Sequence, residues 1–325
     1  MRILLTGSRG QLGQALRASL PAKLAGEPVD LIRTARKPEP AQNVVGLDLA
    51  DPEACHAAVM EHKPDWVLNA GAYTAVDRAE SELELAQAVN AGAPRAFAEA
   101  LAQSSDRSRL LQISTDFVFN GEQSHPYRPE DPRNPISAYG TSKAAGEQAV
   151  ADALGTANHA GISGRATILR TSWVYGPVGR NFLLNMLRLH HQKAATGEPL
   201  RVVADQVGCP TSTAELARAC WASIERRANG ILHWSDAGVA SWYDFAVAIG
   251  ELGEQIGLLE TAAKVQPICT ADFPTPAQRP SYSLLDCTST RAQLALAPRH
   301  WRDSLNVTIL HNKDGLKQLI KAAKA

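Results

Sequence analysis

The first half of the chain alternates short apolar runs with longer segments in which apolar residues recur at helical spacing. Residues 51–62 and 81–103 are typical of the helical segments. The apolar runs, each of strand length, are 3–6, 29–33, 44–47, 66–69, 110–114 and 167–170. Because strands that alternate with helices pair in parallel, the pattern predicts an α/β fold built on a doubly wound parallel sheet.

Polar residues follow these runs at the positions where such sheets bind ligands. Open α/β sheets hold ligands beyond the carboxyl ends of their strands. The predicted strand ends carry Gly7 and Ser8, then Asp48, then Asn69 to Gly71, then Ser114 to Asp116, and finally Thr171 and Ser172. We therefore expect the functional site along one edge of the sheet.

Three glycines at three-residue spacing, Gly7, Gly10 and Gly13, separate the first apolar run from a helical pattern. In a dinucleotide-binding turn the first lets the chain bend, the second lets the backbone approach a pyrophosphate, and the third lets helix and strand pack closely. An ordinary strand-turn-helix connection also carries glycines, but the strand before and the helix after are what a binding turn requires. We expect Gln11 and Leu12 to contact the cofactor too.

The glycine turn and the strand pattern together predict a Rossmann-type dinucleotide-binding domain over residues 1–172 and 211–236. The second half of the chain is less regular, and its proline-bounded stretches at 199–210 and 267–280 predict loops that wall a substrate pocket. A smaller, interleaved substrate-binding domain is predicted over residues 173–210 and 237–325.

The end of the second predicted strand decides which dinucleotide is bound. An acidic residue there binds the ribose hydroxyls of NAD, whereas arginine accommodates the 2′-phosphate of NADP. This chain has no acid directly after the strand and places Arg36 and Lys37 there. The pair favours NADPH, with NADH still possible, although a solvated basic turn would have the same residues.

Tyr139 and Lys143 lie four residues apart in a helix-patterned segment, so their side chains share one helix face. A free phenol has a pKa of about 10, and lowering it to about 7 takes roughly 4 kcal/mol. One lysine charge at about 4 Å supplies that much at an effective dielectric of about 20. Such a pair can protonate a carbonyl oxygen. The same spacing also occurs by chance on solvated helix faces.

Charge and cysteine content narrow the class of protein. Lysine and arginine together number 33, and so do aspartate and glutamate. The chain therefore has no excess of positive charge that would favour binding to nucleic acid. The first apolar run is too short for a secretory leader, and no apolar stretch approaches the roughly 18 residues of a membrane helix. Five scattered cysteines without a Cys-x-x-Cys pair predict reduced, buried thiols in the cytoplasm and no metal site.

The order of these features resembles the extended short-chain dehydrogenase/reductase family, over nearly the whole chain. The features are the glycine turn, the strand end at 69–71, the Ser-Thr-Asp at 114–116 and the Tyr-x-x-x-Lys at 139–143. The resemblance implies that Tyr139 is the general acid, that Lys143 binds the nicotinamide ribose and lowers the phenol pKa, and that Thr115 bonds the reacting oxygen. It also implies that the cofactor contacts Asp48, Leu49, Gly71, Ala72 and Tyr73.

Finer motifs look like one bacterial branch of that family, the dTDP-4-dehydrorhamnose reductases. They are Ser-Thr-Asp-Phe-Val-Phe-Asn-Gly at 114–121, Arg-Thr-Ser-Trp-Val-Tyr at 170–175, Asp-Gln-x-Gly-x-Pro-Thr at 205–211 and Thr-Pro-Ala-x-Arg-Pro at 275–280. The resemblance implies NADPH-dependent reduction of the C4 ketone of dTDP-4-dehydro-β-L-rhamnose to dTDP-L-rhamnose, the last step in making that activated sugar. The partner is then a small nucleotide sugar.

The same resemblance suggests residues that hold the sugar nucleotide. Thr115 and Asp116 would bind the sugar, and Trp173 would line its site, although Trp173 also fits plain core after a strand. Arg279 offers a fork of donors that suits a diphosphate. A surface salt bridge is the alternative for Arg279.

Departures from the family pattern leave other readings open. A nucleotide-sugar dehydratase would need an acid where Phe117 stands. An epimerase is disfavoured by the 170–175 and 275–280 motifs, and a non-catalytic NADP-binding regulatory subunit by the presence of Tyr139 and Lys143. The glutamate associated with a magnesium-linked dimer is replaced by Ala15, so Mg²⁺ is doubtful although Glu198 is available as another ligand. A homodimer is possible.

Overall fold

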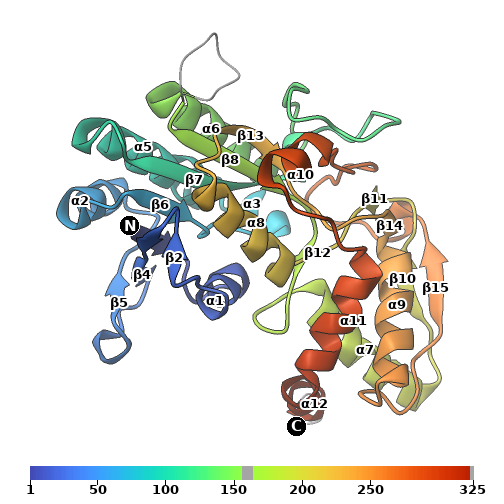
Figure 1. The fold of residues 1–325 in the computed structure, drawn as a ribbon. Helices are drawn as coiled ribbons and strands as arrows, with labels where there is room; N and C mark the ends of the chain where they lie inside the picture. Colours follow the sequence, from blue (N-terminus) through green and yellow to red (C-terminus); the bar gives the residue numbers. More distant parts are fainter. Residues whose placement is uncertain (156–163, 323–325) are drawn as a thin grey trace.

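A seven-stranded parallel sheet forms the centre of the computed structural model, which describes residues 1–155 and 164–322 (Figure 1). Its strand order is β13-β8-β7-β6-β1-β4-β5. The strands are β1 (Arg2–Thr6), β4 (Asp30–Ala35), β5 (Val44–Gly46), β6 (Trp66–Asn69), β7 (Arg109–Thr115), β8 (Ala166–Thr171) and β13 (Gly230–His233). All six predicted strands and the α/β class are confirmed. The seventh strand, β13, was missed because its four residues follow a helix with little pattern of their own.

Helices cover both faces of this sheet. On one face α1 (Gln11–Ala18) and α8 (Thr213–Glu225) pack together over buried leucines of β1 and β6. On the other face lie α2 (Pro52–His62), α5 (Ala93–Ser104) and α6 (Ala138–Leu154). The predicted helix at 51–62 is confirmed, with the Asp51 side chain capping its first turn by accepting from the Ala54 amide. Two layers of helices on one sheet bury both strand faces, as a doubly wound sheet requires.

The helical segment predicted at 81–103 is one helix of three parts. It runs as α4 (Leu83–Gln87), a π-helical turn (Ala88–Gly92) and α5. The short α3 (Val76–Ala79) precedes it. Such π turns insert one residue into a helix and are frequent at functional sites.

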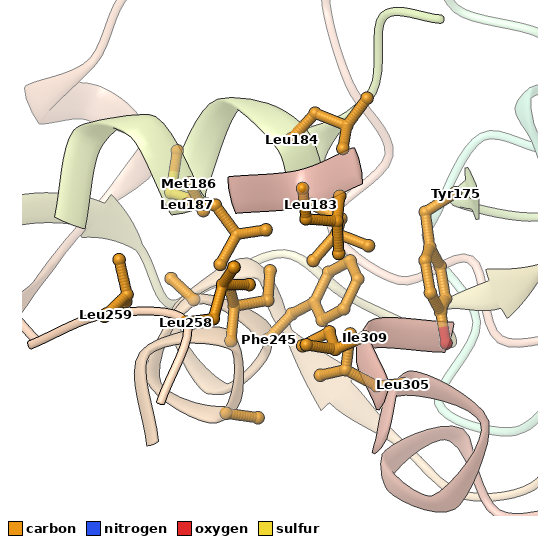
Figure 2. Packing of buried hydrophobic residues seen from close by; sticks show 14 of the residues in the cluster. Tyr175, Leu183, Leu184, Met186, Leu187, Phe245, Leu258, Leu259, Leu305 and Ile309 are labelled. Carbon is orange, nitrogen blue, oxygen red and sulfur yellow. The ribbon is translucent and has the colours of Figure 1, made fainter. Parts of the chain in front are cut away.

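A second helical layer lies beyond the sheet, where α7 (Phe182–Thr196), α9 (Trp242–Gln255), α11 (Trp301–His311) and α12 (Lys313–Ala322) share one apolar cluster. Figure 2 shows Phe245 packed among Leu183, Leu305 and Ile309 in that cluster. This core is separate from the two clusters on the sheet faces. The predicted boundaries between two interleaved domains stay a prediction.

Short strand pairs lie outside the seven-stranded sheet. Parallel β9 (Val174–Tyr175) and β12 (Thr211–Ser212) pair, as do antiparallel β11 (Val207–Gly208) and β14 (Ala240–Ser241). The remaining elements are the pair β10 (Leu200–Val203) and β15 (Val265–Ile268), the pair β2 (Lys23–Leu24) and β3 (Glu27–Pro28), and α10 (Thr288–Leu294). The stretches predicted as loops at 199–210 and 267–280 therefore contain β10, β11 and the end of β15.

The cysteine prediction needs one correction. Cys55, Cys209, Cys220 and Cys287 are free and buried, but Cys269 is free and exposed. Cys269 lies where β15 ends and a short 3-10 turn (Thr270–Asp272) begins, outside the packed layers. Among residues 1–155 and 164–322, no helix is long and apolar enough to cross a membrane.

Candidate active site

Two glycines of the turn after β1, Gly7 and Gly13, have no room for a side chain. Gly7 has a φ of +61°, and a Cβ on it would lie 2.7 Å from the Gly71 Cα. A Cβ on Gly13 would lie 2.2 Å from the Gly7 carbonyl oxygen. Gly10 donates its amide to the same oxygen at 2.8 Å. The turn is thus compact and leads directly into α1 at Gln11, as an anion-binding turn requires.

A cleft of about 660 Å³ opens beside this turn, over the ends of β1, β4 and β6. The residues predicted for the cofactor that line it are Gly7, Gly10, Arg36, Asp48, Leu49, Gly71, Ala72 and Tyr73. Lys37 lines it as well, and both Arg36 and Lys37 are exposed. A pyrophosphate turn with cations at one end fits a dinucleotide phosphate ester.

A second cleft of about 540 Å³ continues from the first, since Gly7, Gly10, Gly71 and Ala72 line both. The other predicted residues that it brings together are Gln11, Leu12, Thr115, Asp116, Tyr139, Lys143, Trp173 and Arg279. Gly13 is the one predicted site residue that lines neither cleft. Its place is beneath the turn, where it lets α1 approach β1.

Tyr139 enters this cleft from the first turn of α6. The proline-rich segment before it ends at Ser137, whose side chain accepts from the Gly140 amide and starts the helix. Tyr139 is 9% exposed, and its ring meets Phe117 edge-on at 5.7 Å between centroids. Burial raises the pKa of Tyr139 to about 12, although a hydrogen bond with the Thr115 side chain opposes the change.

The predicted lowering of the phenol pKa is therefore wrong for this structure. Desolvation of the buried phenol is the largest influence on its pKa, and the nearby Asp116 carboxyl raises that pKa further. Lys143 donates to the Ile113 carbonyl oxygen at 2.7 Å. Burial lowers the pKa of Lys143 to about 8, and the nearby Glu147 opposes that shift. A raised phenol pKa keeps Tyr139 protonated, which is the state that a proton donor needs.

Thr115 and Asp116 lie at the carboxyl end of β7, beside the end of β8. The register pairs Thr115 with Thr171, so the motif that ends in Trp173 follows directly alongside. Thr115 Oγ1 accepts from the Phe117 amide at 3.2 Å and donates to Asp116 Oδ1 at 3.0 Å. Burial raises the pKa of Asp116 to about 6, against hydrogen bonds from Ser283 and Thr115.

Trp173 forms an aromatic wall together with Trp242. The two rings stack with centroids 3.6 Å apart and an angle of 7° between planes. Trp242 Nε1 donates to Gln206 Oε1 at 3.1 Å, which ties the wall to the 205–211 motif. Trp173 has a φ of +46°, a backbone conformation that residues other than glycine rarely adopt. It is half-buried and lines the cleft, so the alternative of plain core does not hold.

Arg279 forms the salt bridge that the sequence left as an alternative. Its guanidinium donates to both carboxylate oxygens of Asp77, at 3.0 and 2.9 Å. Asp77 belongs to α3, whereas Arg279 lies about 200 residues later, so the ion pair crosses from one part of the chain to the other. The guanidinium lowers the pKa of Asp77. Arg279 still lines the cleft while it is paired.

The chain is similar to known proteins over nearly its whole length. The family model described as "RmlD substrate binding domain" matches residues 1–313. A dTDP-4-dehydrorhamnose reductase of Sinorhizobium fredii is 38% identical over 311 residues, covering 94% of this chain and 95% of the relative. The chain belongs to the dTDP-4-dehydrorhamnose reductase family.

Two further relatives bear on what the family binds. A probable dTDP-4,6-dihydroxy-2-methyloxan-3-one 4-ketoreductase of Streptomyces antibioticus is 40% identical, covering 94% of this chain and 93% of that protein. The crystal structure of the Bacillus anthracis dTDP-4-dehydrorhamnose reductase in complex with NADP has a TM-score of 0.79 and 30% identity, covering 95% and 99% of the two chains. Relatives in one family thus carry names for different sugars.

Glu198, the residue considered from the sequence as a magnesium ligand, is engaged in an ion pair. Glu198 pairs with Lys193 at the end of α7, and Ala15 offers no ligand atom. Outside residues 156–163 and 323–325, no three His, Cys, Asp or Glu side chains are placed to hold a metal ion. Whether magnesium links two copies of the chain stays a prediction.

Two side chains that shape or support the cleft, Trp242 and Asn90, were missed from the sequence. Trp242 has no motif of its own beyond the Ser241 cap at the start of α9. Asn90 sits in the π turn, where its Oδ1 accepts from the Tyr73 amide at 2.9 Å and its Nδ2 donates to Ser142 Oγ at 3.0 Å. Asn90 therefore links the cofactor loop to the helix that carries Tyr139. A π turn has no sequence signal that periodicity detects.

Proposed function

We propose that the protein reduces the C4 ketone of dTDP-4-dehydro-β-L-rhamnose to dTDP-L-rhamnose, using NADPH. The observation that carries the proposal is the meeting of Thr115, Tyr139 and Lys143 in a cleft that continues into a dinucleotide cleft. Membership of the reductase family supports the same reaction. A proton donor beside a dinucleotide site is what carbonyl reduction needs.

The chain's own residues handle the proton and the ketone oxygen. A nicotinamide dinucleotide, when bound, supplies the hydride that reduces C4. Tyr139 donates its phenolic proton to the oxygen as negative charge develops there, because an alkoxide is far more basic than a phenolate. Thr115, which lines the same cleft, donates a hydrogen bond to the ketone oxygen. Lys143, anchored on the Ile113 carbonyl, holds the ribose and a positive charge next to the phenolate that forms.

The choice of NADPH over NADH rests on the end of β4. Arg36 and Lys37 line the adenosine part of the cleft. Among the acidic residues that line this cleft, Asp48 is the one closest to them in sequence. The Asp48 carboxylate accepts from the Ala50 amide at 3.0 Å, so part of its hydrogen-bonding capacity is used locally. Two cations suit a 2′-phosphate better than two ribose hydroxyls. NADH remains usable, since the glycine turn serves either dinucleotide.

The sugar nucleotide is proposed to lie between the aromatic wall and Asp116. The sugar packs against the wall formed by the stacked Trp173 and Trp242 rings, and the Asp116 carboxyl accepts from or donates to a sugar hydroxyl. Arg279 reaches a substrate phosphate only by releasing one or both bonds to Asp77. If a substrate phosphate replaces the Asp77 carboxylate, the Arg279 guanidinium keeps two hydrogen-bond acceptors.

A second candidate is the reduction of a different dTDP-4-ketosugar. The observation that favours it is the 40% identity to the Streptomyces antibioticus protein, against 38% to the Sinorhizobium reductase. The two differ in the sugar that their names give, while the proton donor and cofactor cleft would serve either. The shape of the wall formed by Trp173 and Trp242 then decides which sugar fits.

The test follows oxidation of NADPH by purified protein with dTDP-4-dehydro-β-L-rhamnose generated in place. Product is identified as dTDP-L-rhamnose by mass and by the stereochemistry at C4. A parallel reaction offers other dTDP-4-ketosugars, and the ratio of kcat/KM values assigns the substrate. Binding of NADPH without turnover of any ketosugar would overturn the proposal and leave a non-catalytic role.

A further inference from the structure

Arg9, in the glycine turn, is a cation that the cofactor proposal has not used. It lines the adenosine part of the cleft together with Arg36 and Lys37. The turn is held against the end of β4, because the Ser8 amide donates to the Thr34 carbonyl oxygen at 3.1 Å. Arg9 and Arg36 therefore approach the same end of the cleft from two different segments. Three cations converge where the sequence alone suggested two.

Glu39 holds Arg9 in this structure. Their side chains form an ion pair, and each is 38% exposed. Glu39 is itself fixed by its backbone, since its amide donates to the Val44 carbonyl at 2.9 Å and its carbonyl accepts from the Val44 amide at 3.1 Å. The carboxylate is thus carried on a braced loop between β4 and β5. It stays near Arg9 even when their contact breaks.

We propose that Arg9 is a ligand for the 2′-phosphate of the cofactor and that Glu39 competes with that phosphate for it. The inference rests on the proposed use of NADPH. A half-exposed ion pair is weak, so a phosphate dianion displaces the carboxylate. Glu39 therefore limits the selectivity for NADPH over NADH, and Arg9 supplies it.

Adenosine nucleotides test this without any turnover. Adenosine 2′,5′-bisphosphate and adenosine 5′-monophosphate differ only in the 2′-phosphate, so the ratio of their dissociation constants isolates its contribution. Calorimetry on the full chain would compare wild type with Arg9→Gln, Glu39→Gln and the double variant. The matched control is Glu251→Gln, which breaks the exposed ion pair with Arg302 on the other part of the molecule.

Glu39→Gln is expected to tighten the bisphosphate about fivefold and to leave the monophosphate unchanged. Arg9→Gln is expected to weaken the bisphosphate about tenfold, again with no change for the monophosphate. The double variant should behave like Arg9→Gln, because Glu39 acts through Arg9. The control should match wild type for both nucleotides.

Two results would overturn the inference. One is an Arg9→Gln variant that weakens both nucleotides equally, which would make Arg9 a general support of the turn. The other is a Glu39→Gln variant that leaves the ratio of constants unchanged. Either result leaves sugar reduction untouched, because that activity is measured by turnover and can proceed with NADH. Thermal unfolding of each variant checks that the fold is kept.

Discussion

The two parts of the cleft are built in different ways. The dinucleotide part is made by backbone and by residues close to strand ends, and its central feature is the packing of Gly7 and Gly13 against neighbouring backbone. The sugar part is made by side chains from distant segments, such as the stacked Trp173 and Trp242 or the ion pair of Asp77 with Arg279. The first part should therefore tolerate no added atoms, whereas the second should respond to altered side chains.

The separation also bears on function. A substitution in the dinucleotide part should alter cofactor binding. A substitution in the aromatic wall should alter only the binding of the nucleotide sugar. Tyr139 stands between the two parts, because it lines the cleft that contains both the glycine turn and Trp173.

Tyr139→Phe is expected to have the largest effect. Removing the phenolic hydroxyl removes the proton donor, which should lower kcat about a thousandfold. The NADPH dissociation constant should stay within about twofold of wild type, because the ring still packs on Phe117. Stopped-flow reduction and fluorescence titration measure the two quantities. Tyr243→Phe is the control. A comparable loss of kcat in both variants would show that the Tyr139 hydroxyl is not the proton donor.

Gly13→Ala should damage the dinucleotide part through one methyl group. The new Cβ would lie 2.2 Å from the Gly7 carbonyl oxygen and 2.7 Å from the Ser8 Cα, so α1 must move away from β1. Overpacking of this kind costs about 1–3 kcal/mol of stability. Chemical unfolding and NADPH binding should both show the loss.

Gly315→Ala is the matched control for that substitution. A Cβ on Gly315, in the helix α12, meets no atom within 4 Å. Because alanine favours a helix over glycine by up to about 1 kcal/mol, Gly315→Ala should be neutral or stabilising. Equal destabilisation by both substitutions would contradict the distinction between a backbone-packed turn and a side-chain site.

The same difference explains how far the sequence could predict the molecule. The glycine turn, the strand ends and the Tyr139 helix are local features, so spacing alone located them and the sheet brought them together. Trp242 and Asn90 depend on contacts between distant segments, which no periodicity records. The direction of the Tyr139 pKa shift was predicted wrongly, because the sequence shows the spacing between Tyr139 and Lys143 but does not show that the phenol is buried.

Trp242→Leu should change the sugar part alone. It removes the stacked partner of Trp173 and the hydrogen bond to Gln206. Loss of an aromatic pair is worth about 0.5–1.5 kcal/mol, so the KM for the nucleotide sugar should rise about tenfold at most. Trp242→Phe keeps a ring and should recover most of that loss. A rise in the NADPH dissociation constant would break the proposed separation of the two parts.

The smallest expected effect is a pH dependence from Lys143. Burial lowers the pKa of this ammonium to about 8, so the side chain is charged below that pH and loses its proton as pH rises through it. Cofactor affinity should then weaken about threefold between pH 7 and 9, since the neutral amine has lost its charge. Tyr139, with a pKa near 12, stays protonated over this range and contributes nothing to the slope.

Lys143→Arg sharpens that experiment, because a guanidinium keeps its charge throughout the range. A flat titration of NADPH affinity for Lys143→Arg beside a sloping one for wild type would assign the slope to Lys143. Equal slopes in both proteins would place the titrating group elsewhere. The neighbouring Asp116 has a pKa of about 6 and would produce its change at lower pH, which separates the sugar side from the cofactor side by the pH at which each responds.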